Sequence, residues 1–167
     1  LVSKSLESSK LKEVTVQEEL ETMDLYMNIE NIRFSNEIEY TINVDNSLNL
    51  IEIKVPPLVL QPFLENALWH GLSSKKGDKK IILSVFKPSN NFIQIDIEDN
   101  GIGRKASAKI KSKKVINRKS IGIELTKERL HNFIKGFENS FSLHFNDLID
   151  DDKNPKGTKV ALKIPLF

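Results

Sequence analysis

Five stretches of this sequence alternate apolar and polar residues one by one, and this alternation constrains the fold more than any other feature. The stretches are 38–44, 51–55, 92–98, 141–145 and 160–164. Because successive side chains of a strand point to opposite faces, such stretches predict strands with one face in the core and one in water. Residues 81–86 are expected to add a sixth strand.

Segments whose apolar residues recur with helical spacing lie between these predicted strands. Thr15 and Glu18 have the spacing of a capping box, which predicts a helix from about Thr15 to about residue 34. Further helices are expected at 58–72 and 123–137. Together the elements predict a two-layer α/β sandwich, in which a mixed, mostly antiparallel sheet carries helices on one face. A doubly wound parallel sheet is disfavoured, because its strands would be apolar on both faces.

The composition narrows the class of protein. The chain has 167 residues, which suits one domain with a substantial core, and its 25 basic and 23 acidic residues leave a net charge of +2. It contains no cysteine, which excludes disulfide scaffolds, thiolate zinc sites and thiol nucleophiles. No stretch of the sequence approaches the roughly 18 consecutive apolar residues of a membrane span. The first residue is Leu rather than Met, so we expect a piece of a longer protein.

The first candidate site segment lies in the second predicted helix. Asn66 and His70 are four residues apart and so share a helix face, with Pro62 one turn before Asn66. The carboxamide oxygen of an Asn is a hard ligand that suits Mg²⁺, which takes its other ligands from water and phosphates. The alternative is that Asn66 bonds neighbouring backbone and that His70 is an ordinary exposed or capping side chain.

The second segment, Asp99-Asn100-Gly101-Ile102-Gly103, ends a predicted strand. The carboxylate of Asp99 can accept a hydrogen bond from an exocyclic amine, and Gly101 and Gly103 let the backbone approach a flat ligand closely. The alternative is an Asn-Gly hairpin turn, which would need a second alternating strand straight afterwards. The residues from Arg104 onward do not supply one.

Two glycines near later elements form a third group. Gly122, in Ser120-Ile121-Gly122-Ile123, is expected just ahead of a helix N-terminus, where free N–H groups can face an anion. Gly157 and Thr158 precede the last predicted strand. Either glycine could equally belong to an ordinary helix start or turn.

Taken in this order, the segments resemble the Bergerat ATP-binding fold. Residues 55–71, Val-Pro-Pro-Leu-Val-Leu-Gln-Pro-Phe-Leu-Glu-Asn-Ala-Leu-Trp-His-Gly, resemble the N box of LytS/YehU-type sensor histidine kinases. The segment from Glu18 to Phe34 and the pair Arg129-Leu130 also resemble that family. The resemblance covers nearly all of the chain after about residue 11.

The resemblance implies that the chain binds ATP together with Mg²⁺. By it, Asn66 would hold the ion against the ATP phosphates, and His70, one turn further on, would be a phosphate neighbour. These two residues would form the catalytic set. Asp99 would accept a hydrogen bond from the adenine amino group.

The same resemblance implies roles for the remaining candidates. Gly101 and Gly103 would let the chain pass beside the base. Helix amides near Ile121 and Gly122 would reach the phosphates, and Thr158 would support the adenine end through water.

The sequence departs from the family at three places. Ser120 stands where the family usually has Gly, and Leu125 stands where it usually has Asn, which removes a polar contact near the phosphates. Residues 104–119 correspond to the ATP lid and hold eight basic residues, so they are expected to form a mobile loop with a little helix. They could attract the triphosphate or an acidic partner. No aromatic platform accompanies them, and no nucleic-acid partner is expected.

Kinases of this family pass the γ-phosphoryl group of ATP to a histidine and then to an Asp of a response regulator. No His precedes His70 here, so the acceptor is expected upstream, in a helix of the same chain or of a partner in a homodimer. Residues 1–34 are expected to end that upstream region and 35–167 to form the ATP-binding domain, on the cytoplasmic side of a membrane-anchored kinase. Relatives that hydrolyse ATP carry a Glu where Pro62 stands, so little hydrolysis is expected.

Two other functions fit parts of the same pattern. A non-catalytic module that senses nucleotide or acts as a scaffold would have lost productive phosphate geometry through Leu125 and the altered lid. A serine kinase of the anti-sigma type would share the fold, but the upstream helix and the Pro-Pro signature before the N box count against it. Titration with Mg-ATP would separate the first alternative from a kinase.

Overall fold

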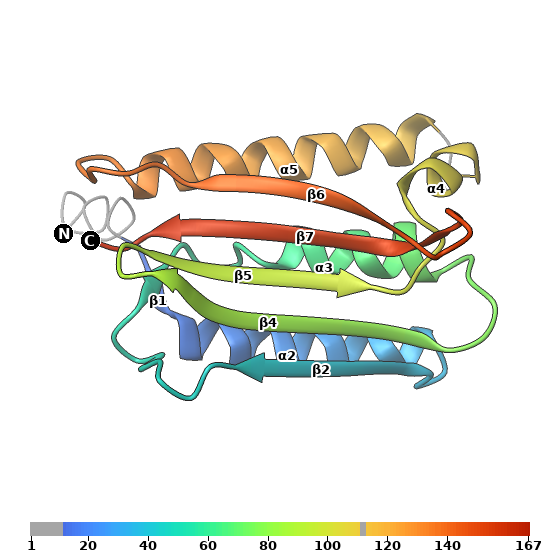
Figure 1. The fold of residues 1–167 in the computed structure, drawn as a ribbon, viewed down its shortest axis with the longest axis horizontal. Helices are drawn as coiled ribbons and strands as arrows, with labels where there is room; N and C mark the ends of the chain where they lie inside the picture. Colours follow the sequence, from blue (N-terminus) through green and yellow to red (C-terminus); the bar gives the residue numbers. More distant parts are fainter. Residues whose placement is uncertain (1–11, 111–112) are drawn as a thin grey trace, which may run out of the picture.

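The computed structural model describes residues 12–110 and 113–167, which form a two-layer α/β sandwich (Figure 1). One layer is a five-stranded sheet with the strand order β2–β4–β5–β7–β6. Its strands are β2 (Ile38–Val44), β4 (Lys79–Ser89), β5 (Phe92–Asp99), β6 (Ser142–Ile149) and β7 (Pro155–Pro165). Strands β2 and β4 pair in parallel and the other neighbours pair antiparallel, which confirms the predicted mixed, mostly antiparallel sheet.

The other layer consists of helices. They are α2 (Val16–Arg33), α3 (Gln61–Asn66), the π-helix η1 (Ala67–Leu72), α4 (Arg104–Ile110) and α5 (Lys113–Phe133). In Figure 1, α2 and α3 lie behind the sheet, and α5 runs along its β6 edge. Side chains such as Ile93 and Ile95 of β5 and Leu64 of α3 are fully buried between the layers. Within the described residues, no helix combines the length and the hydropathy that a membrane span requires.

The first helix begins where the capping box predicts. Thr15 is its N-cap: the Thr15 Oγ1 accepts a hydrogen bond from the Glu18 N–H at 3.0 Å, and Glu18 Oε1 accepts one from the Thr15 N–H at 3.3 Å. The buried face of α2 carries Val16, Leu20, Met23 and Met27. These side chains join the same core as the sheet. The boundary between an upstream region and the domain at residue 34 stays a prediction.

One predicted strand is much shorter in the structure. Of residues 51–55, only β3 (Lys54–Val55) is a strand, and it pairs with β1 (Val14–Thr15). The carbonyl oxygens of Leu50 and Ile53 instead accept hydrogen bonds from the first two backbone N–H groups of α2, at 3.3 and 2.8 Å. Because these N–H groups have no partner inside the helix, the segment serves to complete the helix start.

The predicted second helix is present, with an irregular second half. It runs from Gln61 as α3 and continues as η1, and Pro62 lies in its first turn as predicted. A π-helix is uncommon and often coincides with a functional site. The irregular turns hold His70, which the sequence singled out.

The predicted lid has a different structure from the one expected. Residues 104–119 lie in α4 and the first part of α5, apart from 111–112, which fall outside the described residues. Lys, Arg and Ala are strong helix formers, so a segment rich in them can be helical without large apolar side chains. The expectation of a mobile loop with a little helix is therefore wrong.

A buried carboxylate and a guanidinium hold the segment that leads into α3. Glu19 is 2% exposed, and its carboxylate accepts hydrogen bonds from the Leu58 N–H at 2.8 Å and the Leu60 N–H at 3.1 Å. Arg129 of α5 donates to the carbonyl oxygen of Pro57. Burial raises the pKa of Glu19, while these backbone hydrogen bonds and the charge of Arg129 oppose the rise. Side chains of α2 and α5 thus both bind the short segment 57–60.

We expect Glu19→Ala to lower the free energy of unfolding by about 2–4 kcal/mol, because two buried N–H groups lose their acceptor. Urea denaturation measures the loss. Glu21→Ala is the matched control, since Glu21 is an exposed carboxylate on the same helix and should change stability by less than about 0.5 kcal/mol. Equal losses in the two variants would show that Glu19 does not hold the segment.

Candidate functional site

Asp99, the last residue of β5, is the centre of the candidate site. Its side chain is 6% exposed, and its Oδ1 accepts a hydrogen bond from the Gly101 N–H at 2.8 Å, which fixes the orientation of the carboxylate. Gly71 of η1 lies directly against it, so that a Cβ at this position would come within 2.7 Å of Asp99 Oδ1. The helix that carries Asn66 and His70 therefore ends on the carboxylate.

Two further glycines make the close packing around Asp99 possible. A Cβ on Gly101 would lie 2.4 Å from the carbonyl carbon and oxygen of Gly71, and the Ile102 N–H donates to that oxygen at 3.0 Å. Gly157 has a φ of 141°, and a Cβ there would lie 2.0 Å from the backbone oxygen of Asp99. The backbone of Gly101 thus contacts that of Gly71, and the backbone of Gly157 contacts that of Asp99, with no room for a side chain between them.

Thr158 lies opposite Asp99 in the antiparallel pairing of β5 with β7. Side chains directly opposite each other in such a pair share one face of the sheet. Both residues are buried on the face that the helices cover. The structure therefore brings together two candidates that are 59 residues apart in the sequence.

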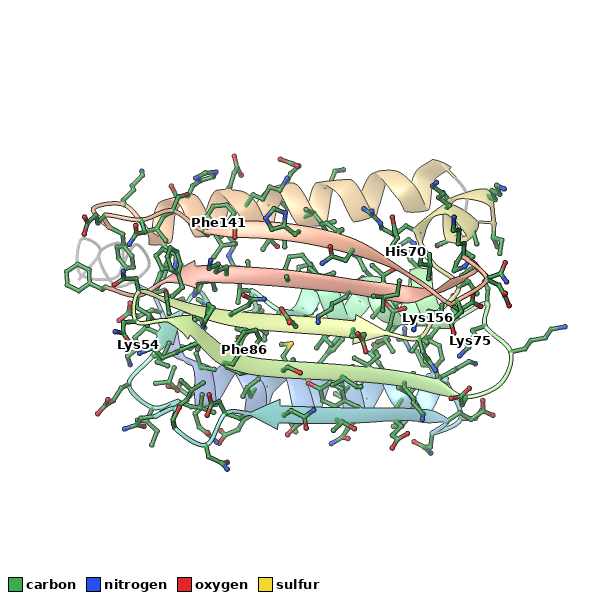
Figure 2. The ribbon with its side chains drawn as sticks, viewed as in Figure 1. Lys54, His70, Lys75, Phe86, Phe141 and Lys156 are labelled. Atoms are coloured by element: carbon green, nitrogen blue, oxygen red, sulfur yellow. The ribbon has the colours of Figure 1, made fainter. Side chains whose placement is uncertain are left out.

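Asn66 and His70 meet Asp99 and Thr158 at a single cavity. Its polar and glycine lining consists of Asn66, His70, Gly71, Asp99, Gly103, Arg104 and Thr158. Apolar side chains complete the wall, among them Phe63, Ile97 and Phe145. In Figure 2, His70 lies toward the end of the molecule that also holds Lys156 of the β6–β7 hairpin. The structure thus brings these four side chains to one cavity, and their roles in binding stay a prediction.

The cavity is narrow as it stands. Its free volume is about 20 Å³, enough for about one water molecule. Ligand pockets for drug-sized molecules commonly reach roughly 300–1,000 Å³. A ligand of nucleotide size therefore needs some of the lining residues to move.

One polar atom of the Asn66 side chain has no hydrogen-bond partner among the described residues. Its Nδ2 is buried, and no other described residue forms a hydrogen bond with it. A buried amide without a partner is costly, so the position favours a ligand that completes it. Among the described residues, no group of three or more His, Cys, Asp or Glu side chains could hold a metal ion.

Two predicted site residues lie elsewhere. Gly122 is inside α5 rather than ahead of a helix N-terminus, and its carbonyl oxygen accepts a hydrogen bond from Thr126 Oγ1 at 3.0 Å. Ile121 is 59% exposed and lies with Leu125 along a separate groove on α5. The expected helix start at Gly122 is therefore wrong, because α5 begins at Lys113 and the amides of its interior turns bond within the helix.

Sequence reasoning missed several lining residues. Arg104 and Phe145 both contribute to the cavity wall, yet neither stands in a motif that the sequence singled out. Phe145 looked like one apolar position of an alternating strand. Arg104 looked like one of many basic lid residues. Their role depends on strand order and on the position of α4, which no local pattern encodes.

Comparison with known sequences identifies relatives over most of the chain. No protein-family model matches it. The chain is 34% identical to the sensor protein LytS of Streptococcus agalactiae serotype V over 164 residues, which cover 96% of this chain and 26% of LytS. It is 36% identical over 115 residues to the uncharacterized protein YwpD of Bacillus subtilis (strain 168), covering 69% of this chain and 40% of YwpD. It therefore spans about a quarter to two fifths of the length of these curated relatives.

Solved structures share the fold. The catalytic domain of histidine kinase ThkA, in a nucleotide-free form, superposes with a TM-score of 0.59 at 13% identity, covering 92% of this chain and 94% of that domain. The mycobacterial sensor histidine kinase MprB gives a TM-score of 0.58 at 16% identity, covering 92% and 96% of the two chains. ThkA in complex with the response regulator protein TrrA gives 0.55 at 14% identity, covering 98% of this chain and 46% of that one.

The glycine packing predicts opposite effects for two Gly→Ala substitutions. Gly101→Ala should cost about 1–3 kcal/mol of unfolding free energy, since its Cβ collides with the backbone of Gly71. Gly122→Ala should add about 0.5–1 kcal/mol, because Gly122 lies within a helix and nothing lies within 4 Å of its added Cβ. Thermal and urea unfolding measure both changes. A Gly101→Ala variant as stable as wild type would contradict the close contact.

Proposed function

In sequence and in fold this chain is a catalytic ATP-binding domain of the LytS type of sensor histidine kinase. From this premise we propose that it binds ATP with Mg²⁺ and supplies the γ-phosphoryl group to a histidine that lies upstream of these 167 residues, in the same protein chain or in a partner. One observation carries the proposal. The carboxylate of Asp99, the amide of Asn66 and the side chains of His70 and Thr158 line the same cavity between sheet and helices.

We assign the adenine end of the ligand to Asp99. A fixed, buried carboxylate is a strong acceptor for the exocyclic amino group of a purine, because a hydrogen bond to a charged partner is stronger than a neutral one. Gly101 holds the carboxylate in place through its N–H, and Gly103 lines the cavity without a side chain. Thr158 lies opposite Asp99 and can bridge to the base through a water molecule.

We assign the phosphate end to Asn66 and His70. The Asn66 carboxamide presents a hard oxygen and a buried nitrogen without a partner among the described residues, so the residue fits a site where an ion and phosphate oxygens complete it. Bound Mg²⁺ would bridge phosphate oxygens and neutralise the charge that develops during transfer. His70, in the turn after Asn66, can donate to a phosphate oxygen.

Phosphoryl transfer needs positioning and charge stabilisation more than covalent help from this domain. The chain would hold the nucleotide, and a histidine that is none of its three would attack. We propose a response regulator as the next acceptor, a homodimer as the whole protein and the cytoplasm as the location of this domain. The support is the family itself, together with the ThkA structure that contains a response regulator.

Replacing Asp99 by Asn tests the adenine assignment. We expect a loss of about 1.5–3 kcal/mol in the binding free energy of Mg-ADP, since the amide keeps the shape but has no charge and only one acceptor oxygen, which the Gly101 N–H already uses. Isothermal titration calorimetry measures it. Asp96→Asn is the matched control, because Asp96 lies on the other face of β5, where its carboxylate is 3.6 Å from Lys159 Nζ. Unchanged affinity in Asp99→Asn would discard the assignment.

Replacing Asn66 by Ala tests the magnesium assignment. The affinity for ADP should fall mainly when Mg²⁺ is present, because the lost amide oxygen binds the ion rather than the base. Calorimetry with Mg²⁺ and with excess EDTA separates the two conditions. Equal losses in both conditions would show that Asn66 does not serve the ion.

A further inference from the structure

Arg104 forms a bidentate ion pair with Asp147 at the wall of the cavity. Its Nε donates to Asp147 Oδ1 at 2.7 Å, and its Nη2 donates to Oδ2 at 2.8 Å. Arg104 is the first residue of α4, directly after Gly103, and Asp147 lies on β6. The pair therefore ties the start of the lid to an edge strand of the sheet.

The strand register places this pair in line with the adenine site. Asp147 pairs with Thr158 across β6 and β7, and Thr158 pairs with Asp99 across β7 and β5. Residues directly opposite each other point to the same face of the sheet. Neighbouring strands are about 4.8 Å apart, so Asp147 lies about 10 Å from Asp99 along this row. That span exceeds the width of a purine and reaches the region of the ribose and the phosphates.

Aromatic packing holds the guanidinium against the cavity. The Arg104 Cζ lies 5.3 Å from the centroid of the Phe145 ring, and Phe145 lines the cavity beside Arg104. The ring of Phe63 from α3 lies 6.4 Å from that of Phe145. Arg104 thus rests on an apolar wall that also faces the helix bearing Asn66.

Charge singles out Arg104 among the lining residues. Of the described residues that line the cavity, it alone carries a permanent positive charge, while Asp99 contributes a negative one. A nucleoside diphosphate or triphosphate brings further negative charge into the same space. A guanidinium presents two parallel N–H groups that match two oxygens of a phosphate as well as they match a carboxylate.

We propose that Arg104 is a phosphate-binding residue of this pocket and that Asp147 holds its guanidinium at the wall until a nucleotide takes it over. The inference rests on the proposed function and adds a residue to it. Exchange of partners is feasible because the ion pair is exposed to solvent. The side chains of Arg104 and Asp147 keep 39% and 46% of their surface, and exposed pairs contribute little net stability. The narrow cavity also requires a lining group to move when a nucleotide enters.

The test compares, by calorimetry, the affinities of two ligands for the wild-type chain, three variants and one control variant. The ligands are ADP, which carries phosphates, and adenosine, which lacks them. The proteins are the wild-type chain, Arg104→Gln, Asp147→Asn and the double variant. Lys109→Gln is the matched control, since Lys109 is an exposed cation on the same helix and does not line the cavity. Melting temperatures confirm that every variant folds.

We expect Arg104→Gln to weaken ADP binding about tenfold or more and to leave adenosine within about twofold, since only the phosphate contact is lost. Asp147→Asn should strengthen ADP binding by about two- to fivefold, because the guanidinium no longer has to leave a partner. That gain should vanish in the double variant. Lys109→Gln should bind both ligands as wild type does.

Two results would overturn the inference and leave the proposed function intact. ADP could bind Arg104→Gln as tightly as wild type, or both ligands could bind it more tightly, which would make Arg104 a mere obstruction. A wild-type chain that binds neither ligand at millimolar concentration would overturn the proposed function itself. The adenosine measurement therefore separates the two failures.

Discussion

The backbone contact between Gly71 and Gly101 decides where the second helix can sit on the sheet. At this contact a Cβ on either glycine would collide, either with the carboxylate of Asp99 or with the opposite backbone. The Ile102 N–H donates to the carbonyl oxygen of Gly71, so the end of the helix and the loop after β5 are joined directly. Because the helix cannot retreat from the strand here, Asp99 is buried beneath it. Main-chain contacts thereby fix the distance between the Asp99 carboxylate and the helix that carries Asn66 and His70.

At the N-terminal end of the same helix, two charged side chains bind the backbone of the preceding segment. Glu19 of α2 accepts two backbone hydrogen bonds from the segment ahead of α3, and Arg129 of α5 donates to the carbonyl oxygen of Pro57. The segment needs this support because Leu58 has a φ of 60°, a conformation that costs free energy for a residue with a side chain. Asn66 and His70 lie between the two anchored ends. Under the proposed function, a helix fixed at both ends would place Asn66 and His70 precisely enough to position phosphate oxygens for transfer.

Local patterns predicted the parts of this protein whose structure is decided locally. The capping box predicted the start of α2, and alternation predicted the strands β2, β5, β6 and β7 and the buried face of β5. The same reasoning failed where a partner elsewhere in the chain decides the outcome. Residues 51–55 alternate as a strand does, yet the carbonyls of Leu50 and Ile53 accept hydrogen bonds from the first N–H groups of α2. The site shows the same division. Asp99 and Asn66 stood out as motifs, whereas Arg104 and Phe145 became visible only through strand order, and Gly122 was misplaced because a helix start was assumed in the middle of α5.

Two carboxylates in this domain show how burial separates a structural role from an exchangeable one. Glu19 is almost entirely buried, and its carboxylate accepts hydrogen bonds from the main-chain N–H groups of Leu58 and Leu60. Removing it leaves those groups unpaired, so its contacts persist as long as the protein is folded. The hydrogen bonds between Asp147 and Arg104, at 2.7 and 2.8 Å, are as short as those of Glu19 or shorter, but both side chains remain in contact with water. Water can replace either partner, and the guanidinium can turn to a phosphate at small cost. Under the proposed function, a site that loads and unloads nucleotide would need exchangeable contacts such as the Arg104–Asp147 pair at its rim and permanent contacts such as those of Glu19 beneath it.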